Sequence, residues 1–171
     1  AGSLGYAQNA EVSGAYGCSH GKMNRKITQQ NTDASPNSPV HSFNVLEYKL
    51  NVDIYNCFIT PFPKSFNGTS QMTFKVDSVI NSIKLNANNT SIGIDTVKIG
   101  ASVLTFTHLS NIVTINLDRT YNPGETVVMN IAYHHNNVTD NSFYVSSGMV
   151  FTDFPPEGAR GFFPCWDKPG D

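Results

Sequence analysis

A chain of 171 residues suits one domain, which buries about two-thirds of the surface of its unfolded chain. Charged residues make up only 14 % of the chain, the net charge is −2, and no basic run exceeds Arg25-Lys26, so we expect no nucleic-acid partner. No apolar stretch approaches the roughly 20 residues that span a bilayer, so we expect no membrane partner either.

The first 40 residues lack any sustained hydrophobic period and end in the segment Pro36-Asn37-Ser38-Pro39. Proline disfavours helix for the residue before it. We therefore predict a flexible tail or strap for residues 1–40 and one domain for residues 41–171.

The polar composition and the cysteines bear on the compartment. Asn, Ser and Thr take the place of charged residues, which is typical of exported β proteins. Three cysteines, Cys18, Cys57 and Cys165, permit one disulfide and leave one thiol over. We expect a secreted or periplasmic protein, with the pairing of the thiols left open.

A strong period-two pattern begins after Phe43. Apolar residues alternate with polar ones up to Pro61 and Pro63, which predicts one long strand with one buried face formed by Tyr48, Leu50, Val52, Ile54 and Phe58. Cys57 falls on the opposite face of this strand. Asn67-Gly68 is then typical of a turn.

Further short strands follow at regular intervals. Met72, Phe74 and Val76 form one apolar face. Other runs cover residues 82–85, 92–99, 103–107, 112–117 and 127–133, with Asn122-Pro123-Gly124 as a tight turn. Since no helical stripe interrupts them, the sequence predicts an all-β fold, a twisted antiparallel β-sandwich.

The last twenty residues are dense in proline, glycine and aromatic side chains, which favours a shaped loop over a strand. Residues 158–169, which we call the signature, include Gly158-Ala159-Arg160 and Phe163-Pro164-Cys165-Trp166-Asp167, and they end at Pro169. This segment resembles the Ala-Arg-x-x-Phe-Pro-Cys-x-Asp-x-Pro signature of aminopeptidase N and its relatives, a family of zinc metallopeptidases. The resemblance extends back over the strands to about residue 43.

The resemblance implies a saddle-like amino-terminal domain whose loop before the signature lines the substrate cleft. Family members usually place Gln or Glu five residues before the Arg, where it helps to bind the free amine of the substrate. That position is Pro155 here. The resemblance therefore leaves Asp153 and Glu157 as the acidic residues that could bind the amine. Glu157 could instead pair with a neighbouring Arg.

The remaining signature residues are predicted to be structural. Arg160 and Asp167 are expected to brace the loop, and the indole of Trp166 is expected to pin it to the sandwich. The full structural set is Ala159, Arg160, Pro164, Trp166, Asp167 and Pro169.

Catalytic residues are not expected in this chain. A zinc peptidase of this family needs two His at i and i+4 with a Glu between them, and the sequence contains no His-Glu pair. Adjacent His134 and His135 would point to opposite faces of a strand and could not chelate one ion together. Zinc, the only cofactor implied, would belong to a catalytic domain encoded further along.

Two functions remain in view. The first is a non-catalytic amino-terminal portion of a zinc aminopeptidase that shapes and closes the substrate cleft, with the catalytic domain and the peptide substrate as partners. The alternative is a non-catalytic sandwich that serves as a binding or scaffold module. If the domain is truncated at Asp171, an exposed strand edge is expected to cause self-association.

Overall fold

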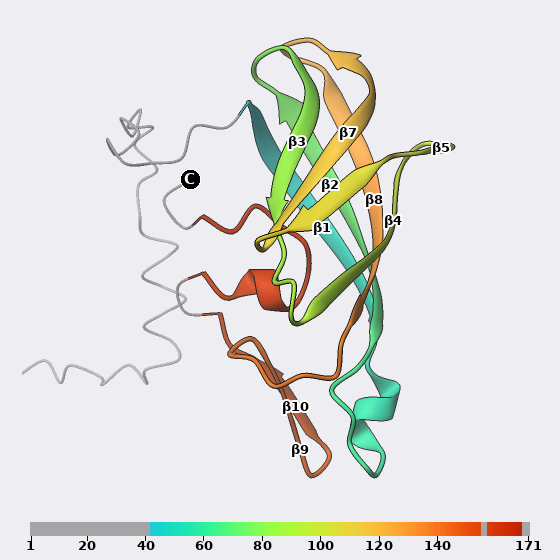
Figure 1. Ribbon diagram of the computed structural model, residues 1–171, viewed down its shortest axis with the longest axis vertical. Helices are drawn as coiled ribbons and strands as arrows, with labels where there is room; N and C mark the ends of the chain where they lie inside the picture. Colours follow the sequence, from blue (N-terminus) through green and yellow to red (C-terminus); the bar gives the residue numbers. More distant parts are fainter. Residues whose placement is uncertain (1–41, 155–156, 169–171) are drawn as a thin grey trace, which may run out of the picture. The chain divides into compact units, whose positions relative to one another are not determined.

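The computed structural model describes residues 42–154 and 157–168, which are almost entirely β-structure (Figure 1). Two short 3-10 turns, η1 (Tyr55–Phe58) and η2 (Ala159–Gly161), are the helical segments in these ranges. The strands are β1 (Phe43–Asp53), β2 (Asn67–Val76), β3 (Ile80–Asn86), β4 (Ile92–Ile99), β5 (Ser102–Val103), β6 (Phe106–Leu109), β7 (Ile112–Tyr121), β8 (Thr126–His135), β9 (Phe143–Ser146) and β10 (Met149–Thr152). The tail predicted for residues 1–40 lies outside the described residues.

The strands form three antiparallel sheets. A five-stranded sheet has the order β1-β2-β8-β4-β5, a three-stranded sheet the order β3-β7-β6, and β9 pairs with β10 as a separate hairpin (Figure 1). Buried side chains from the two larger sheets join in one hydrophobic core. The predicted all-β sandwich is therefore confirmed. No described helix is long and apolar enough to cross a membrane.

The alternation in β8 shows how the sequence builds this core. Val127, Met129, Ile131, Tyr133 and His135 are all buried, and the residues between them are exposed or half-buried. Because successive side chains point to opposite faces of a strand, this pattern turns one whole face of β8 toward the second sheet. Each fully buried aliphatic side chain contributes about 1.5–3 kcal/mol to folding.

The long strand predicted to reach Phe58 is shorter than expected. It ends at Asp53, whose Oδ1 accepts a hydrogen bond from the backbone N of Tyr55 at 3.2 Å and so starts the η1 turn. The turn buries Cys57 and leaves Phe58 exposed, the reverse of the prediction. Leu50 is also exposed, whereas Tyr48 and Val52 of the same predicted face are half-buried.

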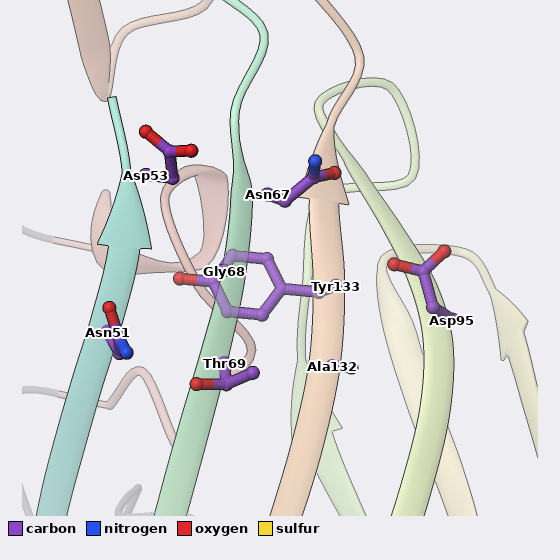
Figure 2. A pocket seen from close by; sticks show the side chains of 8 residues that line it. All are labelled: Asn51, Asp53, Asn67, Gly68, Thr69, Asp95, Ala132 and Tyr133. Carbon is purple, nitrogen blue, oxygen red and sulfur yellow. The ribbon is translucent and has the colours of Figure 1, made fainter. Parts of the chain in front are cut away.

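One of the two predicted turns is correct. At Asn122-Pro123-Gly124 the chain reverses, with Gly124 at φ +91°. Asn67-Gly68, by contrast, opens β2 and pairs with both neighbouring strands. The glycine serves a cross-strand contact: a Cβ at Gly68 would lie 2.7 Å from Cζ of Tyr133, its partner in β8. Figure 2 shows the Tyr133 ring crossing β2 at this glycine.

Two other features differ from the sequence prediction. The run predicted at residues 103–107 divides between β5 and β6, which belong to different sheets. The β9–β10 hairpin was not predicted, although Ser147 and Gly148 turn it with positive φ. Its strands are only four residues long and therefore give little periodic signal. The hairpin ends at Thr152, a few residues before the signature.

Candidate functional site: the signature loop

The signature follows β10 and forms a loop, Glu157–Lys168, which we call the signature loop. It contains the η2 turn, in which the backbone N of Phe162 donates to the carbonyl O of Ala159 at 2.9 Å. Pro164 is buried in the loop, and Ala159 is half-buried. Pro155 and Pro169, which were also singled out from the sequence, lie outside the described residues.

Arg160 is the centre of a charged network inside this loop. Its Nε donates to Oδ2 of Asp167 at 2.9 Å, and its Nη2 donates to the Asp167 carbonyl O at 3.0 Å. The backbone N of Arg160 donates to the same carboxylate at 3.2 Å. Asp167 is only 8 % exposed, and its buried carboxylate accepts two of these three hydrogen bonds, both from Arg160. The structure thus brings together the two residues expected to brace the loop.

Glu157 belongs to the same network. One carboxylate oxygen pairs with Nη2 of Arg160, and the other lies 3.4 Å from Nζ of Lys168. Both oxygens already face a cation of the loop. A substrate ammonium group at Glu157 would have to compete with these two side chains.

Asp153 has a different environment. It is exposed, and its carboxylate makes no hydrogen bond or ion pair with the residues that the structure describes. Its backbone N donates to the carbonyl O of Ser142 at 3.1 Å, which fixes the main chain where β10 ends. Of the two acids singled out from the sequence, Asp153 is thus the exposed one and the one without a partner in the described ranges.

The end of β3 holds the signature loop against the sandwich. Asn86 and Cys165 exchange two backbone hydrogen bonds, of 2.7 and 3.0 Å, in an isolated antiparallel bridge. The Oδ1 of Asn86 also accepts from the backbone N of Asp167 at 3.2 Å, and the N of Asn88 donates to the carbonyl O of Arg160 at 2.8 Å. Neither asparagine was predicted from the sequence to hold the loop, because nothing local indicates a partner more than seventy positions away.

Aromatic contacts complete the attachment. The backbone N of Trp166 donates to Oη of Tyr48 at 2.8 Å, and the Trp166 ring lies edge-on to Phe43 with centroids 5.9 Å apart. Tyr48 also makes an edge contact with Phe163 at 5.4 Å. Such pairs contribute about 0.5–1.5 kcal/mol beyond burial. Trp166 thus joins the loop to β1.

The cysteines of the described ranges have no catalytic arrangement. Cys57 and Cys165 are both buried free thiols, so they do not form a disulfide with each other. Burial raises the pKa of the Cys165 thiol well above its usual range. A buried, protonated thiol is a poor nucleophile and a poor metal ligand. Cys18 lies outside the described residues.

A pocket of about 410 Å³ lies beside the signature loop. It is lined mainly by the segment between β8 and β9 and by the first residues of the loop, namely Asn88, Thr139, Asp140, Asn141, Ser142, Glu157, Gly158 and Arg160. All of these residues are polar or glycine. The pocket is therefore suited to polar groups of a ligand.

A second hollow, of about 290 Å³, opens on the five-stranded sheet (Figure 2). Figure 2 shows Asp53 of β1 and Asp95 of β4 on its two sides, with Asn67 between them. Asp95 is already paired, since its Oδ1 lies 2.8 Å from Nδ1 of His134. No signature residue lines this hollow.

The histidines and acids do not cluster as metal ligands. In the part of the chain that the structure describes, no group of three or more His, Cys, Asp or Glu side chains is placed to hold an ion. His134 is half-exposed and His135 is buried, so the two rings point to opposite faces of β8 as predicted.

Comparison with known proteins identifies the family. Residues 45–171 match the model of the Peptidase M1 N-terminal domain. No curated protein matches the chain.

Solved structures share the fold. A variant of the M1 zinc metallopeptidase from Deinococcus radiodurans, bound to the substrate Tyr-Ser-Ala, has a TM-score of 0.62 at 20 % identity, over 74 % of this chain and 30 % of that chain. A two-domain M1 zinc metallopeptidase bound to L-tryptophan has a TM-score of 0.63 at 19 % identity, over 75 % and 30 %. This chain thus spans about 30 % of the length of these structures. Because the family model covers the strands and the signature together, the chain belongs to the Peptidase M1 N-terminal domain family.

Proposed function

We propose that this chain is the non-catalytic amino-terminal portion of a zinc-dependent aminopeptidase and that the signature loop forms one wall of its substrate cleft. Family membership supports this proposal, as does the fold shared with a metallopeptidase that has been solved with a tripeptide substrate. The sequence contains no His-Glu pair, so the zinc ligands would lie in the catalytic domain of the same polypeptide. There, a bound zinc would supply an activated water for peptide hydrolysis.

The observation that carries the proposal is a difference in pairing between two acidic residues, Asp153 before the loop and Glu157 at its start. Both oxygens of Glu157 face cations of the loop, whereas the carboxylate of Asp153 is exposed and has no partner among the described residues. A carboxylate binds an ammonium group through charge-assisted hydrogen bonds. We therefore assign amine binding to Asp153 and loop stabilisation to Glu157.

The assignment is tested in the full-length polypeptide with amino-acid arylamide substrates. Asp153→Asn keeps the size of the side chain and removes its charge, and we expect KM to rise roughly tenfold with kcat little changed. Glu157→Gln should change KM less and should lower the thermal stability of the loop. The control is Asp77→Asn, a change at an exposed acid that directly follows β2 and lies far from the signature in the sequence.

Two results would contradict the proposal. An unchanged KM in Asp153→Asn would remove its role in amine binding. Aminopeptidase activity of the isolated 171-residue chain, with or without added zinc, would place the catalytic residues in this domain after all. A full-length polypeptide without zinc or activity would favour the binding or scaffold alternative.

A further inference from the structure

Ser142 makes hydrogen bonds to the main chain at Asp153 and at Gly158. Its carbonyl O accepts from the backbone N of Asp153 at 3.1 Å, and its Oγ donates to the carbonyl O of Gly158 at 2.6 Å. The serine is only 5 % exposed. One buried residue therefore holds the main chain both before and after the proposed amine-binding position.

Asp140 fixes Ser142 in turn. Its Oδ1 accepts from the backbone N of Ser142 at 2.9 Å and from that of Phe143 at 3.1 Å. Its Oδ2 accepts from Oγ of Ser91 and lies 3.7 Å from Nε2 of the buried His135. These contacts tie the segment between β8 and β9 to Ser91, just before β4, and to the end of β8.

The signature loop approaches this pair without spare room. A Cβ on Gly161 would lie 2.3 Å from Oγ of Ser142 and 2.9 Å from Oδ2 of Asp140. Real side chains do not make contacts this short, so only glycine allows the η2 turn to pack here. A substitution at Gly161 in the loop should therefore displace the Ser142 hydroxyl.

We propose that Ser142, held by Asp140, is a positioning residue that fixes the main chain on both sides of the substrate-binding acid. This inference rests on the proposed function for its effect on substrate. The clamp, by which we mean the hydrogen bonds of Ser142 to Asp153 and Gly158, can be tested without it. A site that is ordered before binding spares the substrate the entropic cost of ordering the loop. Losing the clamp should therefore weaken substrate binding through the altered main chain around Asp153.

The clamp is tested first by hydrogen exchange on the 171-residue chain. Ser142→Ala removes the hydroxyl bond to Gly158 and leaves the backbone bonds of Ser142 in place. We expect amides in peptides spanning residues 151–161 to exchange roughly fivefold faster, as one lost hydrogen bond implies. Gly161→Ala, which would displace the same hydroxyl, should have the same local effect.

The matched control is Ser70→Ala. Ser70 is fully buried, like Ser142, but its hydroxyl has no hydrogen-bond partner among the described residues. This change should leave exchange in residues 151–161 as in the wild type. Unchanged exchange in both Ser142→Ala and Gly161→Ala would overturn the clamp.

The effect on substrate is tested in the full-length polypeptide. We expect Ser142→Ala to raise KM roughly threefold to fivefold while kcat changes by less than twofold. An unchanged KM in Ser142→Ala, in a protein where Asp153→Asn raises KM, would overturn the positioning role. If neither change alters KM while exchange is faster, the clamp stands and the proposed function of Asp153 fails.

Discussion

At the scale of single residues, the signature loop depends on a buried carboxylate that is paired with an arginine. Asp167 is buried and receives three hydrogen bonds from Arg160, and Glu157 screens the outer side of the same guanidinium. Breaking such a pair by removing one partner typically costs about 3–5 kcal/mol, because the other charge is left buried and alone. This network explains why an arginine and an aspartate seven residues apart occur together in the signature.

A second buried titratable residue predicts a pH dependence of stability. The side chain of His135 is fully buried between rings, stacked on Phe66 and edge-on to Phe143. Burial lowers the pKa of His135 below its usual value, although the nearby Asp140 carboxylate opposes this effect and the Lys64 charge adds to it. In the unfolded chain the pKa of histidine is about 6.5.

The sign of this effect follows from proton binding. Between the unfolded and the lower folded pKa, the unfolded chain binds more protons, so the free energy of unfolding should fall as pH drops below about 6.5. It should level off below the folded pKa. Urea denaturation at a series of pH values measures this, and His135→Phe should flatten the decline. A decline that survives in His135→Phe but disappears in the half-exposed control His134→Phe would contradict the assignment.

At the scale of elements, two glycines in β2 and β4, the strands on either side of β8 in the large sheet, test how packing decides the cost of adding a side chain. A Cβ at Gly68 of β2 would meet the ring of Tyr133 at 2.7 Å, and a Cβ at Gly93 of β4 would meet the ring of His134 at 2.4 Å. The two clashes are similar in distance. Tyr133 is 1 % exposed and enclosed by the core, however, whereas the His134 side chain is 41 % exposed.

We therefore expect Gly68→Ala to destabilise the domain by about 1–3 kcal/mol, because the buried ring cannot move without disturbing the core. Gly93→Ala should cost less, because the His134 ring can rotate into solvent. Chemical denaturation of the two variants measures the difference. Equal losses of stability would show that the backbone, and not the ring, limits both positions.

At the scale of the whole molecule, the large sheet ends on one side in β1. Among the described strands, β1 pairs only with β2, and along it Leu46 is 54 % and Leu50 39 % exposed. Unpaired edges with apolar side chains bind further strands. The partner can be a second copy of the chain, so we expect the isolated chain to self-associate.

Sedimentation velocity over a range of concentrations measures this association. A Lys placed on the edge, in Leu50→Lys, should shift the chain toward monomer. Val128→Lys, at an exposed position in β8, which has a strand on both sides, is the matched control and should leave association unchanged. A wild-type chain that stays monomeric at high concentration would show that its edge is covered.

Alternation along β2 and β8 was sufficient to predict an antiparallel sandwich, because burial of one face imposes a period of two on the sequence. The signature likewise indicated the family, because its prolines, glycines and charged pair are local in the chain. The same local rules failed at Asn67-Gly68 and near Phe58. Asn67-Gly68 lies in a strand, where the glycine leaves room for the ring of Tyr133. Before Phe58, the strand ended early, at Asp53.

What only the tertiary structure decided are the contacts between distant segments. Asn86 and Tyr48 hold the signature loop, and Ser142 holds the main chain on both sides of Asp153, yet each is an ordinary residue in its own stretch of sequence. The sequence already allowed Glu157 to pair with an arginine, and the structure selected Arg160 and added the second cation, Lys168. Hydrogen bonds and ion pairs act over a few ångströms in space, and one sequence records them only where the partners are also neighbours in the chain.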